Sequence, residues 1–165
     1  RRGRGAKTAT ERGMANAAFL RTRIEFINSF FASGEVDEIW ITFPDPQLKK
    51  QRVKKRLTSP QFLGYYAKFL KPDGVVHLKT DSRHLHEYTK AVIERNALPL
   101  LACGDDIYGT GMADTDLSIQ TAYERKFREQ GLPITYLRFM LGGRSEFEVP
   151  DFEEDDNLDA SQLGE

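Results

Sequence analysis

The sequence predicts an α/β fold built around a mostly parallel sheet. Between residues 36 and 93, short apolar runs rich in β-branched residues alternate with segments of helical periodicity. This order of strand, helix, strand and helix implies parallel pairing through right-handed crossovers. The chain has 165 residues, of which 39% are hydrophobic, so it is long enough for one domain with its own core.

The elements predicted before residue 44 end in a strand suited to the centre of the sheet. Residues 8–13 have a helical pattern, residues 17–20 suit a short strand, and apolar residues recur at helical spacing over residues 24–31. Gly34 is expected to end that helix. Residues 36–43 are β-branched and aromatic, which predicts a strand. Pro44 and Pro46 should stop it, because a proline nitrogen cannot donate to a sheet.

The elements after residue 57 continue the alternation. Thr58, Ser59 and Pro60 supply a capping residue and a first-turn proline for a helix that reaches Leu70. Residues 71–74, with the sequence Lys-Pro-Asp-Gly, predict its exit turn. A strand is expected over residues 75–80, a helix around residues 85–93, a long loop over 104–115, a helix over 117–130 and a last strand over 134–141.

Charge is distributed unevenly along the chain. Residues 1–56 hold 13 Lys and Arg against 6 Asp and Glu, whereas residues 57–165 hold 11 against 19. The first part therefore suits a polyanionic partner. Residues 145–165 contain no basic residue, and we expect them to form an acidic, disordered tail after a domain that spans residues 1–144.

Composition excludes several classes of protein. The single cysteine, Cys103, cannot form an intrachain disulfide, and no apolar run reaches the roughly 20 residues that a membrane span needs. The chain opens with no signal-peptide pattern, so we expect a cytoplasmic protein without a membrane partner. His77, His84 and His86 do not combine with carboxylates at metal-ligand spacing, so no metal site is expected.

Two acidic residues follow the ends of neighbouring predicted strands. Asp45 lies between two prolines just after the first strand, and Asp81 comes directly after the second. In an open α/β sheet, ligands bind beyond the carboxyl ends of the strands, so both carboxylates point to one site. The alternatives are a plain turn at Asp45 and a helix cap at Asp81.

A basic run begins four residues after Asp45. Its six cations are Lys49, Lys50, Arg52, Lys54, Lys55 and Arg56. Such a run can neutralise several backbone phosphates of RNA or DNA while carrying little sequence information of its own. A solvated basic face is the alternative.

Four segments together resemble the bacterial tRNA (guanine-N7-)-methyltransferases. They are Ile41-Thr42-Phe43-Pro44-Asp45-Pro46-Gln47, the basic run through Arg56-Leu57-Thr58, His77-Leu78-Lys79-Thr80-Asp81, and Thr121-Ala122-Tyr123-Glu124. The resemblance covers about residues 6–141, and Gln47, where many members have Trp, is similar to the form found in Bacteroidetes. It implies a Rossmann-like methyltransferase fold with a mostly parallel sheet and an antiparallel last strand.

The resemblance also implies an activity and a set of site residues. The family transfers a methyl group from S-adenosylmethionine to N7 of a guanine in the variable loop of tRNA. Asp45 would be the active-site acid near the methyl donor, and Thr22 aligns with a position near the adenine of the donor. The substrate-binding residues would be Lys49, Asp81, Thr121, Ala122, Tyr123 and Glu124, and the RNA-interaction residues would be Gln51, Arg52, Val53, Lys54, Lys55 and Arg56.

The resemblance leaves the N-terminal part of the cofactor pocket unmatched. The first strand of the family, its Gly-rich loop and the acidic residue that holds the ribose have no counterpart here, so we expect an N-terminally incomplete enzyme, or else a fragment that does not bind the donor alone. One competing interpretation is a noncatalytic RNA-binding module. A second, a methyltransferase for exocyclic amines, fits less well because Gln47 supplies no aromatic ring to stack a flipped base. The enzyme is expected to be a monomer or a homodimer.

Overall fold

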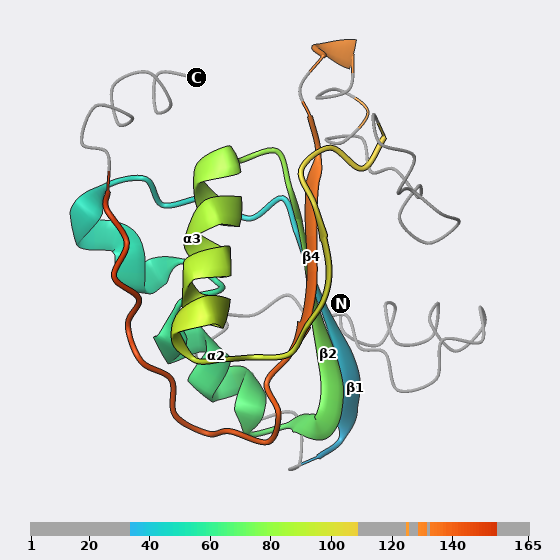
Figure 1. The fold of residues 1–165 in the computed structure, drawn as a ribbon, viewed down its shortest axis with the longest axis vertical. Coiled ribbons are helices and arrows are strands. Elements are labelled where there is room, and N and C mark those ends of the chain that lie inside the picture. The colour runs from blue at the N-terminus through green and yellow to red at the C-terminus, as the bar shows by residue number, and fades with distance from the viewer. Residues whose placement is uncertain (1–33, 109–124, 126–128, 132, 155–165) are drawn as a thin grey trace, which may run out of the picture.

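The computed structural model describes residues 34–108, 125, 129–131 and 133–154 (Figure 1). Its elements are β1 (Val36–Thr42), the 3-10 helix η2 (Lys50–Lys55), α2 (Pro60–Ala67), β2 (Leu70–Thr80), α3 (Arg83–Arg95), β3 (Leu100–Gly104) and β4 (Thr135–Met140). None of the helices in the described part of the chain is long and apolar enough to cross a membrane.

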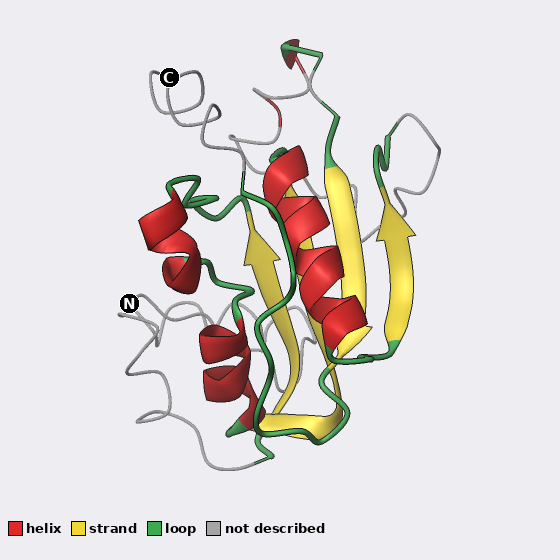
Figure 2. Ribbon diagram, turned by 60° about the vertical axis from the view of Figure 1, so that its left-hand side comes forward, coloured by secondary structure: helices red, strands yellow, loops and turns green. Residues whose placement is uncertain are grey.

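The strands form one mixed sheet with the order β1-β2-β4-β3. Strand β1 pairs with β2 in parallel, whereas β4 is antiparallel to both β2 and β3. Strand β3 therefore runs in the direction of β2, and β4 is inserted between them against that direction. Helices α2 and α3 cover one face of the sheet (Figure 2). The prediction of a mostly parallel sheet with an antiparallel last strand is confirmed.

Local sequence signals place α2 and α3 where they were expected. Ser59 caps α2, because its Oγ accepts a hydrogen bond from the nitrogen of Phe62 at 3.4 Å, and Pro60 opens the helix. Apolar residues at helical spacing then turn one side of each helix toward the sheet. The predicted strands at residues 36–43 and 134–141 are also confirmed, as β1 and β4.

The predicted exit turn at residues 71–74 is wrong, because these residues lie within β2. The register pairs Val36 with Leu70 and Glu38 with Val75, so four residues of β2 lie opposite one residue of β1, and β2 bulges there. Gly74 is required there, since a Cβ atom would lie 2.9 Å from the backbone carbonyl oxygen of Lys71. The turn chemistry of Lys-Pro-Asp-Gly therefore makes a bulge inside a strand.

Other predicted elements are only partly described. Strand β3 was not predicted, because its sequence Leu-Leu-Ala-Cys-Gly is short and ends in residues that do not favour strands. The elements predicted over residues 8–31, and most of the loop and helix between residues 109 and 128, lie outside the described residues.

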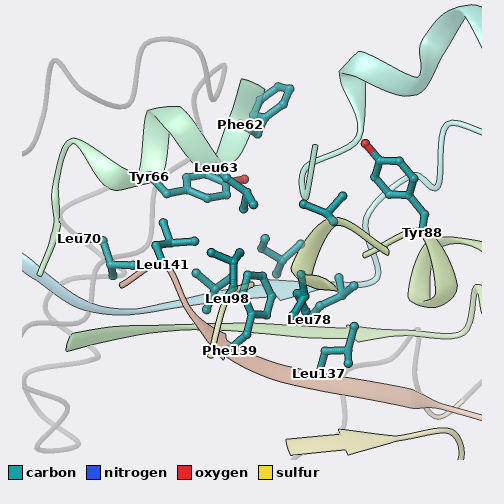
Figure 3. Packing of buried hydrophobic residues seen from close by; sticks show 14 of the residues in the cluster. Phe62, Leu63, Tyr66, Leu70, Leu78, Tyr88, Leu98, Leu137, Phe139 and Leu141 are labelled. Atoms are coloured by element: carbon teal, nitrogen blue, oxygen red, sulfur yellow. The ribbon is translucent and has the colours of Figure 1, made fainter. Parts of the chain in front are cut away.

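The hydrophobic core lies between the sheet and the two helices (Figure 3). Leu63 of α2, Leu78 of β2 and Leu137 of β4 have no exposed surface, and Phe139 fills the space beside them. Full burial of such a side chain is worth about 1.5–3 kcal/mol relative to exposure. The core therefore fixes β1 and β2 side by side, and with them the edge of the sheet that carries Asp45 and Asp81.

Residues 145–154, the first part of the predicted acidic tail, form an extended segment that packs on α3. The ring of Phe152 meets the rings of Tyr88 and His84 edge to face, and Pro150 is buried. Asn96, at the end of α3, holds the backbone of Glu148 through two hydrogen bonds of 2.7 and 3.0 Å. Residues 155–165 lie outside the described residues, and the domain boundary at residue 144 stays a prediction.

Candidate functional site

The site begins where β1 and β2 end together. Thr42 pairs with Lys79, and the nitrogen of Phe43 donates to the carbonyl oxygen of Lys79 at 2.8 Å. Asp45 follows three residues after the end of β1, and Asp81 is the first residue after β2. The expectation that the two strands are neighbours is therefore confirmed, and both acids follow the same edge of the sheet.

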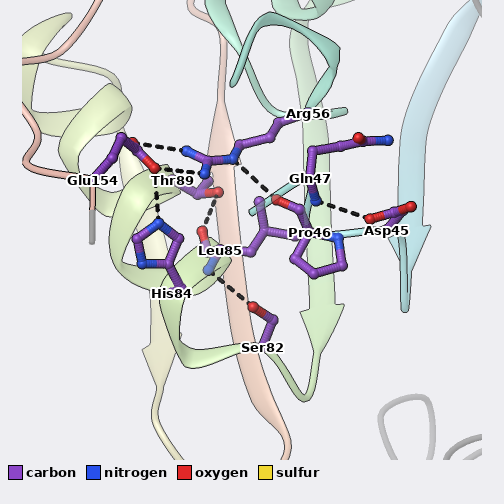
Figure 4. A network of polar contacts seen from close by, with 9 residues as sticks. All are labelled: Asp45, Pro46, Gln47, Arg56, Ser82, His84, Leu85, Thr89 and Glu154. Carbon is purple, nitrogen blue, oxygen red and sulfur yellow. Dashed lines mark hydrogen bonds and ion pairs between the residues drawn. The ribbon is translucent and has the colours of Figure 1, made fainter. Parts of the chain in front are cut away.

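The turn that carries Asp45 has an unusual backbone. Phe43 and Gln47, on either side of the Pro-Asp-Pro sequence, both have a φ of 49°, in the left-handed region that few residues other than glycine adopt. The nitrogen of Gln47 donates to Oδ1 of Asp45 at 2.9 Å (Figure 4). One carboxylate oxygen of Asp45 thus shapes the turn, while the side chain as a whole remains exposed. Such backbone conformations persist only where surrounding contacts hold them.

A shallow depression of about 300 Å³ lies beside this turn. Asp45, Gln47, Leu48, Lys49 and Arg52 line it, and Nε of Arg52 donates to Oε1 of Gln47 at 3.1 Å. The depression therefore brings together one predicted catalytic acid, one predicted substrate-binding lysine and one predicted RNA-interaction arginine.

Asp81 is half-buried, and burial raises the pKa of its carboxyl group above the usual value. It does not cap α3. The cap is Ser82, whose Oγ accepts a hydrogen bond from the nitrogen of Leu85 at 3.1 Å. The interpretation of Asp81 as a helix cap is therefore wrong. Its carboxyl group lies at a half-buried position and does not cap α3.

The basic run forms η2 and the residues that flank it. Five of its six cations are exposed, namely Lys49, Lys50, Arg52, Lys54 and Lys55, together with Gln51, while Val53 is partly buried. These side chains extend from a short helix directly after the Asp45 turn, a position suited to contact with a nucleic-acid backbone.

Arg56 is placed differently from the other predicted RNA-interaction residues. It has no exposed surface, its Nε donates to the carbonyl oxygen of Pro46 at 3.0 Å, and its two terminal nitrogens donate to Glu154 at 3.0 and 2.7 Å. The guanidinium also lies over the ring of Tyr88. The sequence did not indicate this arrangement, because 98 residues separate Arg56 from Glu154.

Five predicted site residues lie outside the described residues. They are Thr22, Thr121, Ala122, Tyr123 and Glu124. Within the described part, the two carboxylates at the sheet edge fit a cationic group such as a sulfonium, because an opposite charge in a partly desolvated site favours it.

Among the described residues, His86, Cys103 and Asp105 form a group of potential metal ligands near α3 and β3. Nε2 of His86 is 3.2 Å from Oδ1 of Asp105 and 3.9 Å from Sγ of Cys103. Arg83, however, takes the second oxygen of Asp105 at 3.5 Å, and burial raises the pKa of the Cys103 thiol, which disfavours the thiolate that a metal needs. This arrangement is that of a hydrogen-bonded cluster, and the expectation of no metal stays a prediction.

The chain is similar to several known proteins and to one family model. A family model described as "Putative methyltransferase" matches residues 4–137. The chain is 50% identical to a tRNA (guanine-N(7)-)-methyltransferase of Bacteroides thetaiotaomicron, over 90% of this chain and 58% of that protein. Proteins of the same name from Porphyromonas gingivalis and Christiangramia forsetii are 52% and 50% identical, over 90% and 84% of this chain and 61% and 62% of theirs. The chain thus spans about three fifths of the length of these relatives.

Proposed function

The chain belongs to the methyltransferase family whose model matches residues 4–137, and we propose that its protein is a tRNA (guanine-N7-)-methyltransferase. The substrate would be a guanine in the variable loop of tRNA, and the methyl donor S-adenosylmethionine. The observation that carries this proposal is that the chain is 50–52% identical in sequence to three proteins of that name. The pairing of β1 with β2, whose ends are followed by Asp45 and Asp81 at one edge of the sheet, supports it. A tRNA substrate implies action in the cytoplasm.

The proposed reaction needs positioning more than it needs a strong base. Guanine N7 carries an in-plane lone pair and no proton, so attack on a methyl group requires alignment and exclusion of water. The bound donor would supply that methyl group on a cationic sulfonium. Asp45, at the end of β1, would hold the positive charge and keep it near the sheet edge.

Lys49 and Asp81 would fix the guanine. The ammonium group of Lys49 can donate to the guanine O6 atom, and the carboxylate of Asp81 can accept from the N1–H and the exocyclic amine. Lys49 lines the same depression as Asp45, and Asp81 follows the strand that pairs with β1, so the three side chains could hold the base and the donor against each other.

The exposed cations of η2 would bind the tRNA backbone. Lys50, Arg52, Lys54 and Lys55 are all exposed, and Arg52 also lines the depression beside Asp45. Their contacts would supply affinity that falls as salt rises, while the base contacts of Lys49 and Asp81 would supply selectivity.

Asp45→Asn in the complete protein tests this function. The amide oxygen of asparagine can still accept the hydrogen bond of the Gln47 nitrogen, so the turn is kept while the negative charge is lost. We expect methylation of unmodified tRNA to fall by about 100-fold or more, with tRNA affinity unchanged. Asp73→Asn, which changes an exposed acid in the β2 bulge, is the matched control and should leave the rate unchanged.

The outcomes separate the competing interpretations. A wild-type protein that binds tRNA but transfers no methyl group would support the noncatalytic RNA-binding module. A methylated product that carries its new group on an exocyclic amine would support the second rival. Equal rates for Asp45→Asn and Asp73→Asn would contradict the role of Asp45.

A further inference from the structure

Arg56 connects three parts of the chain through one buried guanidinium group. Its Nε holds the carbonyl oxygen of Pro46, its terminal nitrogens hold both oxygens of Glu154, and its flat face lies 4.5 Å from the ring centroid of Tyr88. The hydrogen bonds from Arg56 to Pro46 and to Glu154 are drawn in Figure 4. A buried charge without its partner is strongly unfavourable, so the position of this group depends on Glu154.

Glu154 is itself held in place from a second side. Its Oε1 lies 2.9 Å from Nε2 of His84, on the first turn of α3. Two residues earlier, Phe152 packs its ring against Tyr88 and His84. At the other end of the segment, Glu148 is tied to Asn96 at the end of α3. The segment 145–154 thus runs along α3 from its last turn to its first and delivers Glu154 to Arg56.

The hydrogen bond from Arg56 to Pro46 carries this contact to the site. Pro46 directly follows Asp45, inside the turn whose flanking residues Phe43 and Gln47 both have positive φ. That backbone needs external contacts to persist, and the guanidinium supplies one at the centre of the turn.

We propose that Glu154 is a positioning residue for the methyl transfer: through Arg56 it fixes the Pro46 carbonyl and thereby the direction of the Asp45 carboxylate. This inference rests on the proposed function for its effect on rate, although the contact itself does not depend on what the protein methylates. The acidic segment is then part of the site. Through Glu154 it keeps Arg56 buried, so that this cation of the basic run supports the fold and is not exposed to RNA.

Glu154→Gln in the complete protein tests the inference, with Glu153→Gln as the matched control. Glu153 is the exposed neighbour of Glu154, so both variants remove one acid from the same segment. For Glu154→Gln we expect kcat to fall by about 10- to 100-fold. The KM for tRNA should not rise, because a released Arg56 adds a cation to the RNA-facing surface. The control should match wild type in both constants.

The double variant Arg56→Met with Glu154→Leu separates positioning from folding. Apolar residues of similar volume in place of a buried ion pair often preserve stability, but they cannot restore the hydrogen bond to Pro46. We therefore expect the thermal midpoint of wild type together with the low kcat of Glu154→Gln. Recovery of kcat in this double variant would overturn the inference. If Glu154→Gln fails to fold, the kcat of the double variant serves as the test in its place.

Hydrogen exchange provides a readout that does not need methylation. The amides of residues 47–56 should exchange faster in Glu154→Gln than in Glu153→Gln, because the glutamine amide loses the negative charge and one of the two hydrogen bonds to Arg56, which loosens the guanidinium that holds the turn. Unchanged exchange would overturn the positioning role. A wild-type protein without methyltransferase activity would instead contradict the proposed function while leaving this result to stand.

Discussion

Asp81 and Ser82 show how neighbouring residues divide two tasks at the end of β2. Ser82 caps α3 and contributes to stability, whereas Asp81 sits at a half-buried position where burial raises its pKa. A raised pKa means that the folded protein disfavours the ionised carboxylate relative to the unfolded chain. The ionised carboxylate of Asp81 therefore lowers the free energy of unfolding, and a contact with substrate would explain its presence at this position.

We expect Asp81→Asn to leave the protein as stable as wild type or more stable at neutral pH, since it removes a charge that the folded state disfavours. The gain should vanish as pH falls below the usual carboxyl pKa, because Asp81 is then neutral in both states. Methylation of tRNA should fall in the same variant. Thermal unfolding at several pH values, with a methylation assay, checks both expectations.

Ser82→Ala is the companion variant. Loss of the cap should destabilise the protein by about 1 kcal/mol, measured as a shift in the urea midpoint. A larger loss of stability in Asp81→Asn than in Ser82→Ala would contradict this division of tasks.

Glu154 is expected to contribute to the loss of folding stability at acid pH. Burial by itself would raise its pKa, but the hydrogen bonds from Arg56 and His84, with their charges, outweigh burial and hold the pKa below its ordinary value of 4.5. A depressed carboxyl pKa contributes stability that is fully present above the unfolded value and is lost as pH falls through the folded value.

Wild-type protein should therefore lose stability more steeply than Glu154→Gln as the pH falls below 4.5, because this group does not titrate in the variant. The urea midpoint, followed through the fluorescence of Trp40, the single tryptophan of the chain, measures the difference. Glu153→Gln should follow wild type, and parallel acid limbs for all three proteins would show that Glu154 is not linked to folding.

At the scale of elements, the 3-10 helix η2 gathers the cations that face solvent. Lys54 and Lys55 lie at its end and both are exposed, whereas Arg56 next to them is buried. The accessible charge of the basic run is thus smaller than its composition suggests.

Replacing Lys54 and Lys55 by Gln should weaken binding to all tRNAs alike and reduce the slope of log affinity against log salt by up to about 2, since each lost phosphate contact removes about 0.9. Binding titrations at several salt concentrations measure this slope. Lys68→Gln with Lys90→Gln, which changes the C-cap residue of α2 and a cation on α3, is the control. An unchanged slope in the Lys54 and Lys55 variant would place the RNA elsewhere.

Elements with explicit local signals were predictable from the sequence. Ser59 and Pro60 mark the start of α2, and the proline at residue 44 follows the end of β1. The bulge in β2 was not predictable, because its Lys-Pro-Asp-Gly sequence favours a turn wherever it occurs, and only pairing with β1 makes it part of a strand. Strand β3 owes its pairing to β4 rather than to its own residues.

At the scale of the whole molecule, the two oppositely charged parts of the chain meet. The basic run follows β1, the acidic segment returns along α3, and Arg56 and Glu154 join them. Composition predicted the charges of residues 145–154 but not their packing, which depends on Phe152 and Pro150 finding surfaces that form only in the fold. The shared edge of Asp45 and Asp81, in contrast, follows from adjacent parallel strands and could be predicted.

We propose that the edge of the sheet that carries Asp45 serves the methylation of guanine N7 in tRNA. The most direct test of this proposal is mass-spectrometric mapping of tRNA from cells that lack the gene, complemented with the wild-type protein or with Asp45→Asn. We expect 7-methylguanosine in the variable loop with the wild type and its loss with Asp45→Asn. Absence of that nucleoside with the wild type, or equal amounts with both proteins, would contradict it.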